Sequence, residues 1–323
     1  MPDLRSSRVV VTGAGGVIGS GLVRGLAALG ATVTAIDRHH PDPAPTGENV
    51  RCVTADVTDA ERMRDLLAGA DIVYHLAYLM GEEANRDPVA AARINVLGGT
   101  TVLQACLDGG VGRVLLASSI SVFGSTADYR EDELPLSDRS PRLGSKGISV
   151  YGAGKAYLEL LAEHYTRRHG LLVGGLRPGA VIGRSRTTGR ARTVANIVST
   201  AVHTRRLSFG NGREAFTAIH VDDVVGAFLA LGEAPAPAFR ETAFFNLAGD
   251  HATVRSLCEE VAALVPGVTL DIADGDSDEL FGTTPFIRDD GIHRTVGFTR
   301  RYPSLRAAVA AEVAELTEAA ATA

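Results

Sequence analysis

The chain has 323 residues, of which 45% are hydrophobic, a formal net charge of −6 and a sequence pI of about 5.9. A chain of this length can bury one substantial core and still form a smaller second lobe. The negative charge excludes a global positive field that would attract nucleic acid or anionic lipid, so we expect a small-molecule partner. No stretch approaches the roughly 20 apolar residues of a membrane span, and no signal peptide is recognisable. We therefore expect no membrane partner and a cytoplasmic location.

Three cysteines, Cys52, Cys106 and Cys258, are widely spaced along the chain. They are odd in number and lie among apolar neighbours, which favours reduced thiols in the core over a disulfide framework or a zinc site. We therefore expect no metal site.

Short apolar runs alternate with longer amphipathic stretches through the first half of the chain. This alternation predicts βαβ units, in which parallel strands are covered by helices on both faces. The predicted strands cover 8–12, 31–36, 71–76, 113–117 and 171–176, and the predicted helices cover 17–29, 90–107 and 151–169.

Beyond Pro178 the alternation loosens into an arginine-bearing loop at 184–192 and, later, an acidic loop at 271–279. These loops predict a smaller lobe that closes over substrate, whereas the apolar runs 216–219 and 243–247 predict a return to the main sheet. The predicted fold is an α/β doubly wound parallel sheet (Rossmann-like) with a smaller, interleaved C-terminal substrate lobe. The predicted domains are 1–177 plus about 215–247 for nucleotide binding, and about 178–214 plus 248–323 for substrate binding.

Three glycines lie at the spacing GxxGxxG between the first strand and the first helix: Gly13, Gly16 and Gly19. Such a turn lets backbone N–H groups and the helix N-terminus approach a pyrophosphate. Asp37 ends the next strand about 20 residues on, where a carboxylate can accept hydrogen bonds from adenosine ribose hydroxyls. The alternative is a glycine turn beside an exposed acid. Because Asp37 would repel a 2′-phosphate, the sequence predicts NAD rather than NADP, although Arg38 could partly accept that phosphate.

Further candidates for cofactor binding follow the third and fourth strands. Asp56, which precedes Val57, could face the adenine amino group, or it could cap the next helix, and both interpretations stay open. The small Ala77 would let the backbone approach the cofactor, whereas His75 is expected to be a satisfied core histidine. Asn95 lies in an otherwise apolar helix and could tie strand ends together beneath the nicotinamide ribose.

Tyr151 and Lys155 lie four residues apart at the start of a predicted helix, so both project from one face. A nearby ammonium and the positive nicotinamide ring would lower the tyrosine pKa from about 10 and make a phenolate available as a base. Ser119 follows a strand at the sheet edge where open parallel sheets bind ligands, and its hydroxyl could hold the substrate oxygen. Alone, these residues are typical of a surface pair and a turn. Beside a dinucleotide loop they predict hydride transfer to or from a secondary alcohol.

As an ordered set, these motifs resemble the extended short-chain dehydrogenase/reductase family, also called the NAD-dependent epimerase/dehydratase family. The resemblance covers nearly the whole chain and rests on 12–19, Asp56, 75–77, Asn95, 116–124, 151–155, 176–179 and 220–223. It implies an enzyme in which Tyr151 exchanges the substrate proton, Lys155 holds the ribose and lowers the tyrosine pKa, and Ser119 orients the substrate oxygen. It also implies NAD contacts near Val17, Ile18, Leu76, Pro178 and Val181.

Departures from the family pattern narrow the chemistry. Family dehydratases that act on nucleotide-hexoses carry an Asp-Glu pair where Ile120 and Ser121 stand here, which argues against water elimination. Nucleotide-sugar epimerases carry a diphosphate-binding Asn shortly after the arginine of the sixth strand, and Ala180 stands in that stretch. The runs 118–124 and 245–248 are similar to members that oxidise small alcohols, such as the threonine dehydrogenase branch.

The loop that should enter the smaller lobe contains four arginines. Clustered guanidinium groups could clamp a carboxylate or phosphate of an anionic substrate, or they could belong to a solvated loop. Tyr78, Met80 and Phe123 would lie near the nicotinamide, although ordinary packing explains them equally well. The arginines are Arg184, Arg186, Arg190 and Arg192, and the candidate substrate residues are Met80, Ser121, Arg190 and Arg192.

Three functions compete at this point. The first is an oxidoreductase with net turnover of NAD, and the second is a nucleotide-sugar 4-epimerase that returns the hydride to the other face and retains its NAD tightly. The third is a cofactor-binding regulator without catalysis. The resemblance also implies a homodimer joined through the helices at 90–107 and 151–169, which carry more apolar residues than one covered face needs.

Overall fold

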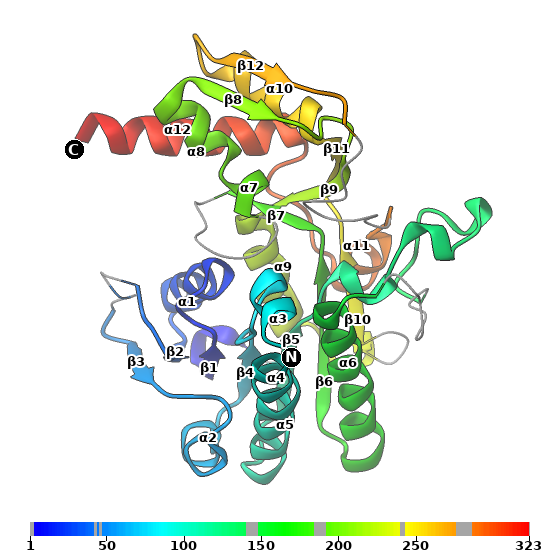
Figure 1. Cartoon of the computed structure of the whole chain (residues 1–323). Helices are drawn as coiled ribbons and strands as arrows, with labels where there is room; N and C mark the ends of the chain where they lie inside the picture. Colours follow the sequence, from blue (N-terminus) through cyan, green and yellow to red (C-terminus); the bar gives the residue numbers. More distant parts are fainter. Residues whose placement is uncertain are drawn as a thin grey trace.

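In the computed structural model, the described residues are 3–41, 44, 47–139, 148–183, 192–239, 243–275 and 286–322. A seven-stranded sheet in the order β10-β6-β5-β4-β1-β2-β3 forms the centre of the molecule (Figure 1). All of its neighbouring strands are parallel, which confirms the predicted doubly wound sheet. The strands are β1 (Arg8–Thr12), β2 (Thr32–Asp37), β3 (Val50–Thr54), β4 (Ile72–His75), β5 (Arg113–Ala117), β6 (Leu172–Pro178) and β10 (Phe244–Leu247).

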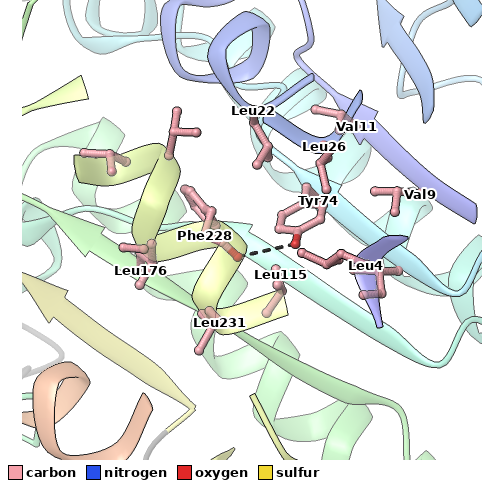
Figure 2. Close-up of a cluster of buried hydrophobic side chains, with 14 of the residues drawn as sticks. Leu4, Val9, Val11, Leu22, Leu26, Tyr74, Leu115, Leu176, Phe228 and Leu231 are labelled. Carbon is pink, nitrogen blue, oxygen red and sulfur yellow. Dashed lines mark hydrogen bonds between the residues drawn. The ribbon is translucent and has the colours of Figure 1, made fainter. Parts of the chain in front are cut away.

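Alternate residues of each central strand are buried on opposite faces, because helices cover both sides of the sheet. Val9 and Val11 of β1 belong to the cluster beneath two helices, whereas Val10 belongs to the cluster on the other face. In the first cluster the Tyr74 ring meets Phe228 edge-on at 6.1 Å, and its hydroxyl donates to the Phe228 carbonyl at 3.3 Å (Figure 2). The first face is covered by α1 (Val17–Leu29) and α9 (Val221–Glu233), and the second by α2 (Ala60–Leu67), α5 (Gly99–Asp108) and α6 (Val150–His169).

The expected helix at 90–107 consists of three consecutive segments. It begins with α4 (Pro88–Ala91), continues as a π-helix over Ala92–Gly98 and ends with α5. π-helical turns are rare and often occur at functional sites. The remaining short helices of the main domain are α3 (Gly81–Arg86), α11 (Asp290–Val296) and 3₁₀ turns over Leu4–Ser6, Ile120–Phe123, Thr126–Asp128, Glu131–Glu133 and Ala236–Phe239.

Two smaller sheets, with helices beside them, lie beyond the carboxyl ends of the main strands (Figure 1). Residues 243–247 return to the main sheet in β10 as expected, but 216–219 lie in β9, which pairs with β7 and β11. That expectation was wrong because the edge of β6 is taken by β10. The elements are β7 (Ala180–Ile182), β9 (Ala215–His220), β11 (Asp250–Thr253), β8 (Arg206–Phe209), β12 (Thr269–Ile272), α7 (Arg192–Ala195), α8 (Ile197–Thr204), α10 (Val254–Leu264) and α12 (Leu305–Thr322).

No helix among the described residues combines the length and apolar character needed to cross a membrane. Nor do any three of their His, Cys, Asp or Glu side chains gather where they could hold a metal ion. Cys106 and Cys258 are buried free thiols, and Cys52 is half-buried.

A buried carboxyl in α12 makes folding stability depend on pH. Glu312 is 3% exposed, and neither of its carboxyl oxygens has a hydrogen-bond partner among the described residues. It lies on the same face of α12 as Ala308, Val309 and Leu316, which belong to a hydrophobic cluster beside the smaller sheets. Burial, and secondarily the charge of Glu315, raises the pKa of Glu312 to about 8. The folded state thus keeps a proton that the unfolded chain releases near pH 4.5, so stability falls as pH rises between these values.

Replacement of this carboxyl should therefore stabilise the protein. We expect Glu312→Leu to raise the melting temperature, and to raise it more at about pH 9 than at about pH 5, with a difference of the order of a few kcal/mol in unfolding free energy. Thermal unfolding followed by circular dichroism at both pH values measures this. Glu318→Leu, at an exposed position of the same helix, is the control and should change little. An equal gain from both variants would contradict the prediction.

Candidate active site

The loop between β1 and α1 comes close to two neighbouring chain segments. Gly13 has φ of +72°, and a Cβ there would lie 2.5 Å from the Ala77 nitrogen. A Cβ on Gly15 would lie 2.2 Å from the His39 carbonyl oxygen, so this glycine is also required, although the GxxGxxG spacing does not single it out. Gly16 is the N-cap of α1 and provides no side-chain cap. The first N–H groups of the helix are therefore available to an anionic group such as a pyrophosphate.

A cavity of about 610 Å³ runs from this loop across the carboxyl ends of the main strands. It brings together residues that are far apart in the sequence, from the first glycine loop to β7. The lining includes almost every residue predicted to bind the cofactor: Gly13, Gly16, Val17, Ile18, Gly19, Asp37, Arg38, Asp56, Val57, Leu76, Ala77, Tyr151, Lys155, Pro178 and Val181.

Asp37 lies at the end of β2 and faces the glycine loop. Its Oδ2 accepts a hydrogen bond from the Gly15 N–H at 2.8 Å, and its Oδ1 accepts one from the His39 N–H at 3.1 Å. The carboxylate is half-buried at the cavity wall, where it can accept further bonds from ribose hydroxyls. With the uncapped N-terminus of α1, it provides the donors and acceptors that NAD requires.

Asp56 is not the N-cap of α2, the helix that follows it. The N-cap of α2 is Asp59, which accepts a hydrogen bond from the Arg62 N–H at 3.0 Å. Asp56 instead lines the cavity, and its Oδ1 accepts hydrogen bonds from the N–H and the hydroxyl of Thr58, both at 2.9 Å. Burial acts to raise the pKa of Asp56, but the Thr58 hydrogen bonds, with help from Arg38, lower it overall. Asp56 is therefore a charged acceptor at the cavity wall.

Two other predicted residues lie behind the cavity wall. The His75 Nδ1 and the Thr12 hydroxyl form a hydrogen bond of 2.7 Å, and burial, assisted by the charge of Lys155, lowers the pKa of His75 to about 3. His75 is thus a neutral buried residue. The Asn95 side chain is outside the lining: its amide donates to the Leu79 carbonyl at 3.0 Å and accepts from the Leu79 N–H at 2.7 Å. Asn95 therefore fixes the backbone that follows β4.

The first two turns of α6 bring Tyr151 and Lys155 to the cavity. The helix begins after Ser149, whose hydroxyl accepts a hydrogen bond from the Gly152 N–H at 3.1 Å. The Lys155 Nζ is buried and donates to the Ala117 carbonyl at the end of β5. Burial lowers the pKa of Lys155 to about 7, with Glu159 acting in the opposite direction.

Ser119 follows β5 and lines the same cavity as Tyr151 and Lys155. Its hydroxyl accepts a hydrogen bond from the Ser121 N–H and donates one to the Ser121 hydroxyl, both at 3.1 Å. Ser121 and Met80, both predicted to contact substrate, also line the cavity. The Ser119 hydroxyl is thus aligned by a neighbour that is itself exposed to the cavity.

A buried polar network lies behind this constellation and was not predicted. The Arg177 guanidinium forms a two-pronged ion pair with Glu159 at 2.8 and 2.7 Å and donates to the Asp138 carbonyl at 2.7 Å. The Ser118 hydroxyl donates to the same Glu159 carboxylate. Phe123 lies under the Arg177 guanidinium, 5.5 Å from it, and is absent from the lining. The network joins α6, β6 and the segment after β5, which carry the residues of the cavity.

The arginine loop falls mostly outside the described residues. Arg184, Arg186 and Arg190 belong to that undescribed part, and Arg192 starts α7 without a described side chain. Among the described residues, hydroxyl, amide and apolar groups line the same cavity as Ser119, Tyr151 and Lys155: Ser121, Ser149, Asn85, Met80 and Ile120. Chemically, the cavity offers a phenol, a lysine amine, a serine hydroxyl and the uncapped N-terminus of α1.

Comparisons with known proteins agree with this geometry. The profile described as "NAD dependent epimerase/dehydratase family" matches residues 9–248. The chain is 32% identical over 239 residues to the UDP-glucose 4-epimerase of Mycolicibacterium smegmatis, covering 70% of this chain and 73% of that protein. It is 28% identical over 278 residues to the 2-alkyl-3-oxoalkanoate reductase of Stenotrophomonas maltophilia, covering 82% and 78%. A solved L-threonine dehydrogenase from Cupriavidus necator is similar with a TM-score of 0.82 and 25% identity, covering 96% and 99%.

Proposed function

Because the chain belongs to the NAD-dependent epimerase/dehydratase family, and is thus an NAD-dependent enzyme of the extended short-chain dehydrogenase/reductase type, we propose that it catalyses net hydride transfer to or from a secondary alcohol or ketone. The observation that carries the proposal is the lining of one cavity. Ser119, Tyr151 and Lys155 line the same cavity as Gly13, Gly16 and Gly19 of the glycine loop.

Each member of the triad has a separate task in this proposal. Tyr151 exchanges a proton with the substrate oxygen, and the Ser119 hydroxyl donates a hydrogen bond to that oxygen and orients it. The Lys155 ammonium stabilises the phenolate and so lowers the tyrosine pKa. Bound NAD would supply the acceptor or donor of the hydride. In alcohol oxidation Tyr151 would take the O–H proton of the substrate as the C–H hydride passes to that acceptor, and the carbonyl would form.

The substrate side favours net oxidation or reduction over nucleotide-sugar chemistry. Ala180 is 7% exposed in β7 and has no group that could bind a diphosphate, and Ile120 and Ser121 supply no acid pair for water elimination. Two of the similar proteins are named as a reductase and a dehydrogenase. The second candidate is a nucleotide-sugar 4-epimerase with tightly bound NAD, which the 32% identity to a UDP-glucose 4-epimerase supports.

The first experiment is mass spectrometry of nucleotide released from freshly purified protein, followed by assays with added NAD⁺ or NADH. A dehydrogenase should bind exchangeable NAD⁺ and form NADH with one of a panel of secondary alcohols that includes L-threonine, or consume NADH with the matching ketones. Retained NAD and interconversion of UDP-glucose and UDP-galactose without net NADH would instead support the epimerase. If no substrate gives either activity, the remaining candidate is a cofactor-binding regulator without catalysis.

Three finer predictions remain proposals. An anionic substrate would be held by guanidinium groups such as those of Arg190 and Arg192. The cytoplasmic location stays a prediction. The division into an NAD-binding domain, 1–177 plus about 215–247, and a substrate-binding lobe formed by the remainder also stays a prediction. Within the first of these ranges, β9 pairs with strands of a smaller sheet.

We also propose a homodimer formed through α4, α5 and α6. Large apolar side chains are exposed on α4, on α6 and on the π-helix between α4 and α5, a feature that often marks a protein interface. Leu160 on α6 is 46% exposed. The others are Val89 at 80%, Leu97 at 53%, Val150 at 47% and Tyr157 at 40%.

A charge on this surface should separate the subunits. We expect wild-type protein to be dimeric at micromolar concentration by light scattering and Leu160→Glu to be monomeric, because burying a carboxylate in an apolar interface is unfavourable. Leu270→Glu is the matched control, since Leu270 is 39% exposed on β12, away from these helices. A monomeric wild type, or an unchanged dimer in Leu160→Glu, would refute the proposed interface.

A further inference from the structure

An aromatic residue that follows β4 lies directly against both ionisable members of the triad. The centroid of the Tyr78 ring is 3.4 Å from the Lys155 Nζ. The same ring meets the Tyr151 ring edge-on, with centroids 5.3 Å apart and planes 84° apart. The Tyr78 hydroxyl donates to the Tyr151 backbone carbonyl at 3.1 Å. One side chain therefore contacts the ammonium, the phenol ring and the first turn of α6.

The ring face is the right kind of group to hold a buried ammonium. Lys155 is only 3% exposed, and burial disfavours its charged form. The face of an aromatic ring carries partial negative charge and attracts a cation placed over it, more strongly where water is excluded. Burial raises the pKa of Tyr78, so its hydroxyl stays protonated and the ring stays neutral. The Ala117 carbonyl and the Tyr78 ring, together with the charge of Glu159, thus favour ammonium at this place.

Two further residues adapt the site to this tyrosine. A Cβ on Gly154 would lie 2.4 Å from the Tyr78 hydroxyl oxygen, closer than real contacts allow, whereas the next ring atom would be 3.6 Å away, an ordinary contact. Position 154 must therefore be glycine as long as the hydroxyl is present. The Asn95 side chain forms hydrogen bonds with both the N–H and the carbonyl of Leu79, and so fixes the segment that carries Tyr78.

We propose that Tyr78 is a positioning residue for the reaction: its ring holds the Lys155 ammonium against the Ala117 carbonyl, and its hydroxyl fixes the backbone of Tyr151. The absence of a side chain at Gly154 leaves room for the Tyr78 hydroxyl, and the hydrogen bonds from Asn95 to Leu79 fix the backbone next to Tyr78. The inference rests on the proposed function for its catalytic consequence, because Lys155 acts on Tyr151 within the triad. Its physical content, the attraction between one ring and one ammonium, can be measured without substrate.

The lysine content of the chain makes that measurement direct. The sequence has two lysines, Lys146 and Lys155, so Lys146→Arg leaves a single lysine. Protein of this background, grown with lysine labelled with ¹³C at the ε carbon, should give one lysine resonance, whose shift against pH reports the Lys155 pKa. We expect Tyr78→Leu to lower that pKa by about one unit, because the ring face is lost while the site stays apolar. Tyr78→Phe keeps the aromatic ring face, so it should change the Lys155 pKa by no more than about a third of a unit.

Gly154 provides a second, independent test. Gly154→Ala should lower kcat/KM at least about tenfold in the wild-type background, where the new methyl group meets the Tyr78 hydroxyl. In the Tyr78→Phe background the same change should have little further effect, because the colliding oxygen is absent. Additive effects of the two changes would overturn the assigned fit between the two positions. Circular dichroism and melting temperature of every variant verify that it is folded.

The outcomes separate this inference from the proposed function. A Lys155 pKa that is the same in wild type and Tyr78→Leu overturns the positioning role, whatever reaction the enzyme catalyses. If the pKa falls as expected while Tyr151→Phe retains full activity, the ring holds the ammonium but the proposed triad chemistry is wrong. A pH profile of kcat/KM that shifts in Tyr78→Leu in parallel with the NMR titration supports both.

Discussion

Tyr151→Phe should lower kcat/KM by about 10²- to 10⁴-fold with the substrate that the panel identifies, because the variant lacks the group that exchanges the substrate proton. The phenylalanine ring keeps the edge-on contact with Tyr78, so the cavity should keep its shape. NAD⁺ binding should weaken by less than about tenfold, since at most one hydrogen bond is lost. Initial rates of NADH formation and calorimetric titration with NAD⁺ measure the two effects.

Tyr157→Phe is the matched control for this experiment. Tyr157 lies on the same helix but is 40% exposed and does not border the cavity, so its hydroxyl should not affect the rate. Equal losses in the two variants would indicate damage to α6 rather than loss of a proton donor. Full activity of Tyr151→Phe would remove the basis of the proposed reaction.

Glu159→Gln should lower the free energy of unfolding by about 3–5 kcal/mol, because it leaves the Arg177 guanidinium buried without its charge partner. The Arg177 and Glu159 side chains are 6% and 12% exposed, so water can replace little of the lost interaction. The substitution also weakens the acceptor of the Ser118 hydroxyl, next to Ser119. Denaturant unfolding followed by circular dichroism measures the loss.

The same helix supplies the control for this prediction. Glu163 pairs with Arg167 across one turn, but both side chains are more than half exposed. Glu163→Gln should therefore change stability by no more than about 0.5 kcal/mol. The double change Glu159→Leu with Arg177→Met should recover much of the stability lost in Glu159→Gln, because it removes the buried charge altogether. A loss of less than about 1 kcal/mol in Glu159→Gln would contradict the assigned role of the pair.

Local and periodic features were the ones that the sequence allowed us to predict. The glycine spacing, the apolar strands and the interval between Tyr151 and Lys155 each depend on a few neighbouring residues. The glycines, Tyr151 and Lys155 all line one cavity. Position at a strand end was equally informative, because parallel strands bring their carboxyl ends to one edge. Asp37, at the end of β2, and Ser119, just after β5, could therefore both be placed at that edge without knowledge of distances.

Features that depend on contacts between distant segments could not be predicted in this way. The partners of Arg177 come from α6 and from the segment before residue 140, and no spacing in the sequence relates them. Strand β9 was assigned to the wrong sheet because an apolar run indicates a buried strand without naming its neighbour. The stacking of Tyr78 on Lys155 likewise depends on the backbone that Asn95 holds.

The return of the chain to the main sheet in β10, after the first strands of the smaller sheets, limits how this enzyme can be divided or recombined. A fragment that ends after β6 would lose β10, which pairs with that strand, and α9, which covers one face of the sheet. It would expose a sheet edge and an apolar face, two features that promote aggregation. The smaller sheets and their helices therefore cannot be replaced by a graft at one junction. Altered specificity is expected to come from changes within loops, with all three sheets retained, so the main sheet and the smaller sheets are expected to have diverged together.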